Sequence, residues 1–256
     1  MSQFHDLSLL DYFDRISIIH LKARADRYRE LARELRRLGI EITHSKVCIP
    51  DPPMPSEASG FPSKSFYGNF LSHLEILKSA QSDGLQSVWV LEDDAIFSHR
   101  FVREQYKIAE FLSRNEWDIC FFGHTLTKEL DTHEIGLPRF SGPLLWAHCY
   151  AVHSRILPRL VAYLEETQHK TARNLQGDRM YIDHAYNLFR KFNPDVITLV
   201  GNPVLSVQSS SQSSLGDVTW YNKHPLARPA VRLVFAIRDE FWRWTDHFFT
   251  FRSGRR

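Results

Sequence analysis

The segment from Ser87 to Ala95 constrains the fold most, because a run of apolar residues ends there in three consecutive carboxylates. The apolar residues favour β structure and predict a buried strand of an α/β sheet. Glu92, Asp93 and Asp94 follow at its carboxyl end, and unpaired charge of this kind is too costly to bury in a core. We therefore expect the three acids in the crevice beyond the strand ends, where open α/β sheets bind ligands. A solvated acidic turn is the alternative interpretation.

The acidic segment also has the composition of a metal site. Clustered carboxylates are hard oxygen ligands of the kind that Mg²⁺ and Mn²⁺ prefer, especially when the metal also holds phosphates. Side chains two residues apart in an extended segment point to the same side, so Glu92 and Asp94 can act together. A metal held there would neutralise a diphosphate and stabilise it as a leaving group, while another carboxylate takes a ribose hydroxyl.

Composition excludes several classes of protein. The chain has 256 residues and a formal net charge of +2, which gives no global signature of nucleic-acid binding. Cys48, Cys120 and Cys149 have no zinc-site spacing and lie in apolar stretches, which predicts buried free thiols and a reducing, cytoplasmic compartment. The first residues carry no basic segment typical of a secretory signal, and no stretch approaches the roughly 18 apolar residues of a membrane span.

Strand and helix patterns alternate along most of the chain, which predicts an α/β class with a mostly parallel central sheet flanked by helices. Strands are expected at 15–21, 41–49, 87–92, 118–122, 144–152 and 196–200, and helices at 24–38, 65–80, 99–112, 154–166 and 178–191. Loops are expected at 50–62, 128–142, 168–177 and 206–216. The second of these loops is interpreted as a hairpin or a lid.

The last residues differ in character from the rest. We divide the chain into a catalytic domain, 1–228, and a basic, aromatic tail, 229–256, with a helix expected at 229–249. Aromatic residues with interleaved arginines on an amphipathic helix suit peripheral contact with a membrane, here at its inner face. A helix packed on the domain, or a dimer contact, is the alternative interpretation.

Several short motifs, taken in order, resemble glycosyltransferase family 25, the lipooligosaccharide β-galactosyltransferase type related to the collagen hydroxylysine galactosyltransferases. The matching pieces are Ile16–Leu21 with Arg24, Asp26 and Arg27, then Gly68–His73, Val90–Ala95, Trp117–Asp118, His148–Val152, Ile182–Asp183 and Pro203–Asp217. The resemblance departs from the family pattern at His20, where an Asn is usual, and at the cysteine position before Leu71. Neither change removes a group that the chemistry requires.

This resemblance implies a GT-A-like, nucleotide-sugar-binding fold and an enzyme of lipopolysaccharide biosynthesis. Its activity would be metal-dependent transfer, with inversion, of a sugar from a UDP-sugar, UDP-galactose above all, to a saccharide of a surface or lipid-linked glycan. Glu92 and Asp94 would hold Mn²⁺ or Mg²⁺, and Asp93 would contact the sugar or the ribose. Inversion needs a carboxylate base near the acceptor hydroxyl, for which Asp183, near an expected helix N-terminus, competes with Asp178.

The remaining donor contacts follow from the same resemblance. Ser72 and His73 would line the nucleotide side, although His73 taken alone is read as a satisfied, partly buried histidine. Gln208 and Asp217 would close the site from the C-terminal loop. The arginines of the helix expected at 24–38 are interpreted as a solvated face, except that Arg24 or Arg27 lies near the end of the first strand and could reach the donor. Two alternatives stay open, a non-catalytic relative that binds a nucleotide sugar and a metal-dependent phosphoesterase.

Overall fold

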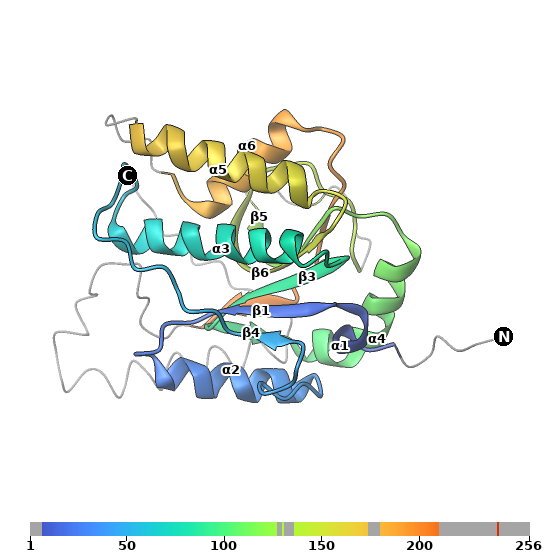
Figure 1. Cartoon of the computed structure of the whole chain (residues 1–256). Coiled ribbons are helices and arrows are strands. Elements are labelled where there is room, and N and C mark those ends of the chain that lie inside the picture. Colours follow the sequence, from blue (N-terminus) through green and yellow to red (C-terminus); the bar gives the residue numbers. More distant parts are fainter. Residues whose placement is uncertain (1–6, 127–129, 131–135, 174–179, 210–239, 241–256) are drawn as a thin grey trace, which may run out of the picture.

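The computed structural model describes residues 7–126, 130, 136–173, 180–209 and 240. The helices are α1 (Leu9–Tyr12), α2 (Ala25–Arg37), α3 (Lys64–Ser82), α4 (His99–Arg114), α5 (Leu157–Arg173) and α6 (Ile182–Phe192). The strands are β1 (Arg15–Ile19), β2 (Val47–Cys48), β3 (Ser87–Glu92), β4 (Ala95–Phe97), β5 (Ile119–Leu126), β6 (Leu144–His153), β7 (Thr198–Val200) and β8 (Ser206–Gln208). Figure 1 shows the sheet between two layers of helices, which confirms the predicted α/β class.

The sheet is mixed. Its strand order is β2-β1-β3-β6-β5-β8-β4, with β7 paired to β5. The pairings of β1 with β2 and β3, and of β5 with β7 and β8, are parallel, whereas β6 is antiparallel to both its neighbours. Strand β4 is antiparallel to β8, so the parallel character of the sheet is weaker than the sequence predicts.

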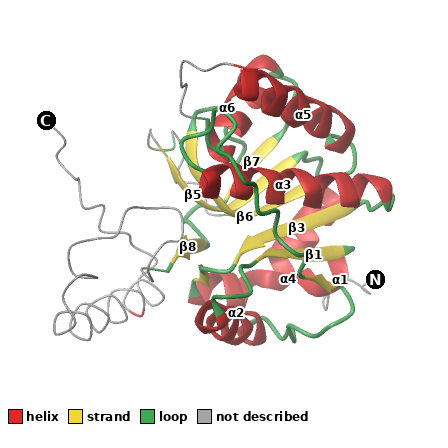
Figure 2. Ribbon diagram, turned by 60° about the vertical axis from the view of Figure 1, so that its left-hand side comes forward, coloured by secondary structure: helices red, strands yellow, loops and turns green. Residues whose placement is uncertain are grey.

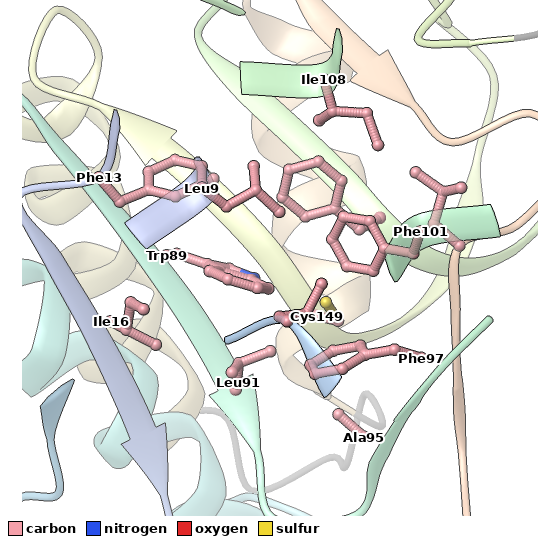
Figure 3. Close-up of a cluster of buried hydrophobic side chains, with 14 of the residues drawn as sticks. Leu9, Phe13, Ile16, Trp89, Leu91, Ala95, Phe97, Phe101, Ile108 and Cys149 are labelled. Carbon is pink, nitrogen blue, oxygen red and sulfur yellow. The ribbon is translucent and has the colours of Figure 1, made fainter. Parts of the chain in front are cut away.

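Each face of the sheet has its own core, because successive side chains of a strand point to opposite faces. Val88 and Val90 of β3 pack with residues of α3, α5 and α6, which lie on one face in Figure 2. Trp89 and Leu91 pack on the other face with residues of α1, α2 and α4. Figure 3 shows the second cluster around Trp89, whose ring lies 5.8 Å from that of Phe101. The strand is thus buried on both sides, as its continuous apolar run predicts.

Capping residues lie at the ends of several helices. Ser63 caps α3, because its hydroxyl accepts a hydrogen bond from the backbone amide of Phe66 at 3.3 Å. Ser98 caps α4 in the same way through Phe101. Gly39 follows α2 with a φ of +75°, the left-handed conformation that glycine adopts without strain after a helix. Helices α2, α3 and α4 therefore begin at or within one residue of their predicted starts at 24, 65 and 99.

Other predicted boundaries are wrong. The strand expected at 41–49 is only Val47–Cys48, because residues 41–47 form turns closed by backbone hydrogen bonds. Strand β5 does not stop at Gly123 but continues through irregular pairing with β6 to Leu126. Helix α5 continues through 168–173, where a loop is expected, and α6 begins at Ile182 rather than near 178. Residues 206–208, also expected in a loop, form β8.

Some predictions lie wholly or partly outside the described residues. They include the tail 229–256 with its expected helix, of which only Glu240 is described, and residues 128, 129 and 131–135 of the proposed hairpin or lid at 128–142. All three cysteines are free; Cys120 and Cys149 are buried as expected, whereas Cys48 is only partly buried. Within the part of the chain that the structure describes, no helix is long and apolar enough to cross a bilayer.

Candidate functional site

The acidic segment lies at the carboxyl ends of two adjacent parallel strands, β1 and β3. Strand β1 pairs with β2 on one side and β3 on the other, so the strand order reverses at this point. Open α/β sheets bind ligands in the crevice beyond the strand ends at such a reversal. The backbone amide of Asp93 donates to the carbonyl of Ile19 at 3.1 Å, which joins the acidic turn to the end of β1.

Asp93 is buried against two basic side chains from the β1–α2 segment. Nδ1 of His20 lies 2.8 Å from Oδ2 of Asp93, and the Arg27 guanidinium donates to Oδ1 at 2.9 Å. Only 8% of the Asp93 side chain is exposed. Because both of its oxygens have partners, Asp93 fixes the start of α2 against the acidic turn.

The carboxyl group of Asp94 has fewer partners among the described residues than that of Asp93. Arg27 also lies 3.2 Å from its Oδ2, but its Oδ1 is buried and has no hydrogen-bond partner among the described residues. Burial, together with the negative charge of Glu92, raises the pKa of Asp94 to about 7, although Arg27 opposes the shift. A buried carboxylate oxygen without a partner is unusual, and it marks Asp94 as a place where a cation would be stabilised.

Glu92 has three donors from distant parts of the chain. Nδ2 of Asn69 lies 3.0 Å and Nε2 of His73 lies 3.3 Å from its Oε1, and Nε2 of Gln208 lies 3.2 Å from its Oε2. Asn69 and His73 are four residues apart on α3, so they share one face of the helix. Burial raises the pKa of Glu92, but the interaction with His73 and the hydrogen bond from Asn69 outweigh it and lower the pKa to about 2.

The donor set suits a hard divalent cation. Asp94 offers an oxygen that has no partner in the described part of the chain, and Glu92 retains acceptor capacity beside its three donors. The described residues contain no group of three His, Cys, Asp or Glu side chains that could hold a metal by themselves. Mg²⁺ is usually bound through one or two carboxylates plus substrate phosphates, so Glu92 and Asp94 fit a cation that arrives with a diphosphate.

Asp183 lies in the first turn of α6 and contacts β6. Its Oδ2 accepts the backbone amide of Trp146 at 3.1 Å, and its Oδ1 accepts the amide of His184 at 2.8 Å. Trp146 has a φ of +70°, which is uncommon for a residue with a side chain and costs free energy. The hydrogen bond that Asp183 accepts from the Trp146 amide stabilises this conformation, so Asp183 has a structural role whether or not it also acts as a base.

The structure brings together only part of the predicted site. Glu92, Asp93, Asp94, His73 and Gln208 form one cluster of contacts. The Ser72 hydroxyl instead donates to the carbonyl of Gly68 within its own helix, and Arg24 pairs with Asp26. Asp178 and Asp217 lie outside the described residues.

Three residues make contacts with the cluster that were not predicted. His20 and Arg27 contact Asp93, Arg27 also contacts Asp94, and Asn69 contacts Glu92. Asn69 has a sequence signal, since it precedes His73 by one helical turn, whereas the first two can be assigned only when β1 and β3 are known to be neighbours.

A second group of polar side chains is buried beside the site. Nε2 of His124 lies 2.9 Å from the carbonyl oxygen of Gly201, and His148 lies beneath Gly123. Burial lowers the pKa of both histidines to about 4, so both rings are neutral at physiological pH.

Comparison with known proteins gives partial matches. No family model matches the chain. Over 129 residues it is 27% identical to procollagen galactosyltransferase 2 of Mus musculus and 26% identical to procollagen galactosyltransferase 2 of Homo sapiens. Each alignment covers 43% of this chain and 21% of the relative, so the chain spans about a fifth of the length of the curated relatives it matches.

Two solved structures share a distant likeness. One is a glycosyltransferase involved in the glycosylation of the major capsid of PBCV-1, with 13% identity and a TM-score of 0.39 over 78% of this chain and 94% of that one. The other is mannose-1-phosphate geranyltransferase from Thermus thermophilus, with 12% identity and a TM-score of 0.33 over 72% of this chain and 58% of that one. Such scores do not by themselves establish a common fold. The sequence matches show that this chain is weakly homologous to procollagen galactosyltransferases over part of its length.

Proposed function

We propose that this protein is a metal-dependent, inverting glycosyltransferase that transfers a sugar from a UDP-sugar to a hydroxyl of a saccharide acceptor. The observation that carries the proposal is the buried cluster of Glu92, Asp93 and Asp94 at the strand-order reversal, with Oδ1 of Asp94 lacking a partner among the described residues. The partial homology to procollagen galactosyltransferases supports the transferase class and supports galactose as the sugar. Membership of the lipooligosaccharide type of family 25, and a surface or lipid-linked glycan as acceptor, are finer parts of the same proposal.

Asp94 and Glu92 would hold Mn²⁺ or Mg²⁺ together with the diphosphate oxygens of the donor. The cation would neutralise the diphosphate and so make it a better leaving group. Asn69, His73 and Gln208 fix the carboxylate of Glu92. This preorganisation lets the site bind charge without first rearranging.

In this proposal Asp183 accepts the proton of the acceptor hydroxyl as that oxygen attacks the anomeric carbon. Each oxygen of Asp183 accepts one hydrogen bond from a backbone amide, that of Trp146 or of His184, and can accept another. The hydrogen bond to Trp146 orients the carboxylate relative to β6, so the base would be held in place before the acceptor binds.

The decisive experiment uses a panel of UDP-sugars and identifies the released nucleotide by chromatography, with Mn²⁺ or with EDTA. Wild type is compared with Asp94→Asn, which keeps the side-chain shape but removes the charge. Asp195→Asn is the matched control, because Asp195 is an exposed acid that pairs with the exposed Arg159.

We expect Mn²⁺-dependent release of UDP from one donor, faster with an added saccharide, abolished in Asp94→Asn and retained in Asp195→Asn. Release of UMP in place of UDP would indicate cleavage of the phosphoanhydride and favour the phosphoesterase alternative. Metal-dependent binding of UDP by calorimetry, without release from any donor or acceptor mixture, would favour the non-catalytic relative.

A further inference from the structure

A chain of hydrogen bonds runs from the acidic cluster into the core of the protein. Nε2 of His73 lies 3.3 Å from Oε1 of Glu92, Nδ1 of His73 lies 2.8 Å from the hydroxyl of Tyr150, and that hydroxyl lies 2.7 Å from the hydroxyl of Tyr186. The side chains of His73, Tyr150 and Tyr186 are fully buried. The chain therefore joins β3, α3, β6 and α6 without access to solvent.

The chemistry of Glu92 sets the direction of the first bond in this chain. An ionised carboxylate only accepts hydrogen bonds, so Nε2 of His73 must carry a proton to bond Glu92. Nδ1 of His73 then accepts from the Tyr150 hydroxyl in a neutral imidazole and donates to it in an imidazolium. In both cases the Tyr150 hydroxyl keeps a hydrogen bond to the hydroxyl of Tyr186. Burial raises the pKa of both phenols above the usual value, which keeps both protons in place.

The same chain reaches the helix that carries the proposed base. Tyr186 lies three residues after Asp183 on α6, and Asp183 accepts the amide of Trp146 at the start of β6. Helix α6 is therefore fixed to β6 by Asp183 and Tyr186, and Asn187 adds two hydrogen bonds to the backbone of Leu144. A displacement of α6 would break the chain that ends at Glu92.

We infer that Tyr150 and Tyr186 are positioning residues that fix the orientation of the His73 ring, so that Glu92 and Asp183 are held in one rigid arrangement. Groups that hydrogen-bond the partners of a metal ligand orient that ligand and tune its affinity for the metal. The consequence for binding rests on the proposed function, whereas the hydrogen bonds of His73 are a property of the protein without ligand. Both tyrosines would act on the acidic cluster through His73.

The first measurement is nitrogen NMR of the imidazole side chains in the metal-free protein, with the His73 signal assigned by its loss in His73→Gln. We expect Nε2 of His73 to carry a proton, because it bonds the carboxylate of Glu92. In Tyr150→Phe the Nδ1 resonance should move as that nitrogen loses its hydrogen bond, and in Tyr186→Phe it should move less in the same direction. An Nε2 without a proton in wild type, or an unchanged Nδ1 resonance in Tyr150→Phe, would overturn the inference.

The second measurement is calorimetry of UDP binding in the presence of Mn²⁺. Tyr150→Phe and Tyr186→Phe should each weaken binding, with the larger loss on the order of 10-fold in Tyr150→Phe. The matched control is Tyr12→Phe, because the hydroxyl of Tyr12 also bonds buried groups, the Leu112 carbonyl and the Trp117 indole, on the opposite side of the sheet. It should lose stability but bind UDP as wild type does.

The two measurements separate the inference from the proposed function. If wild type binds no UDP with Mn²⁺, the proposed function fails, and the NMR spectra still decide whether the tyrosines fix His73. If wild type binds UDP and both tyrosine variants bind it equally well, the positioning role is wrong although the proposed function stands. Tyr186→Phe keeps the test available if Tyr150→Phe does not fold, because it removes only the outer member of the chain.

Discussion

Replacing Arg27 by methionine should lower the free energy of unfolding by much more than the loss of a surface ion pair would. The Arg27 guanidinium lies 2.9 Å from Asp93 and 3.2 Å from Asp94, and all three side chains are at most 10% exposed. Arg27→Met fills the space of the stem but leaves two buried carboxylates without this partner. Breaking a buried ion pair in this way costs about 3–5 kcal/mol, because the remaining charge stays desolvated.

The assay is urea unfolding at pH 7 in EDTA, so that no divalent cation can replace the guanidinium. Arg159→Met is the control, because Arg159 makes an equally short ion pair with Asp195 but both groups are largely exposed. Such a surface pair contributes about 0–1 kcal/mol. The reasoning is refuted if Arg27→Met loses no more free energy of unfolding than Arg159→Met.

A double variant tests the cause of this loss. Asp93→Asn removes the carboxylate that makes the shorter contact with Arg27, at 2.9 Å, so Arg27→Met with Asp93→Asn should be more stable than the sum of the single effects predicts. Residues in one buried network couple by about 0.5–3 kcal/mol. Strict additivity would mean that Arg27 stabilises the protein through packing of its stem rather than through charge.

Two further predictions concern the buried histidines beside the site. Burial lowers the pKa of His124 from its ordinary value of 6.5 to about 4, so the unfolded state binds more protons between these pH values and stability falls as pH decreases through that window. The free energy of unfolding measured in urea should be lower at about pH 4.5 than at pH 7, and this residue should account for about 2 kcal/mol of the difference. In His124→Gln the difference between the two pH values should be smaller by that amount. Gly123→Ala would place its Cβ against Nε2 of His148 and 3.0 Å from the carbonyl of Ser206, and this overpacking should cost about 1–3 kcal/mol in the same assay at pH 7. The φ of Gly123 lies outside the left-handed range, so backbone strain does not add to this loss, and an unchanged free energy of unfolding in Gly123→Ala would refute the clash.

Local patterns predicted the elements that have strong local signals. The continuous apolar run of β3 predicted a buried strand, and α3 and α4 begin at or within one residue of the predicted starts at 65 and 99. The three-residue strands β4 and β8 were missed because a strand this short shows no periodicity. They form by pairing with each other, Ala95 opposite Gln208, across more than 100 residues of sequence.

That long-range pairing also explains part of the site. Gln208 reaches Glu92 because β8 lies beside β4, the strand that follows the acidic turn. The family resemblance places Gln208 near the site in a flexible loop, whereas the structure holds it at the end of a strand. Helix α5 was predicted too short because its polar residues after Glu166 resemble a loop, yet Thr167 and Thr171 are buried and extend the packed face.

The sequence by itself determined that three carboxylates end a central strand, because apolar continuity followed by charge allows no other placement in an α/β sheet. It could not determine how these acids differ. Only the tertiary structure gives Asp93 two basic partners and Glu92 three hydrogen-bond donors. It also leaves one oxygen of Asp94 without a hydrogen-bond partner among the described residues. The physical reason is that the pKa and ligand affinity of a buried carboxylate depend on its desolvation and on neighbours within a few ångströms. Those neighbours come from β1, α2, α3 and β8, which are adjacent only in the folded chain.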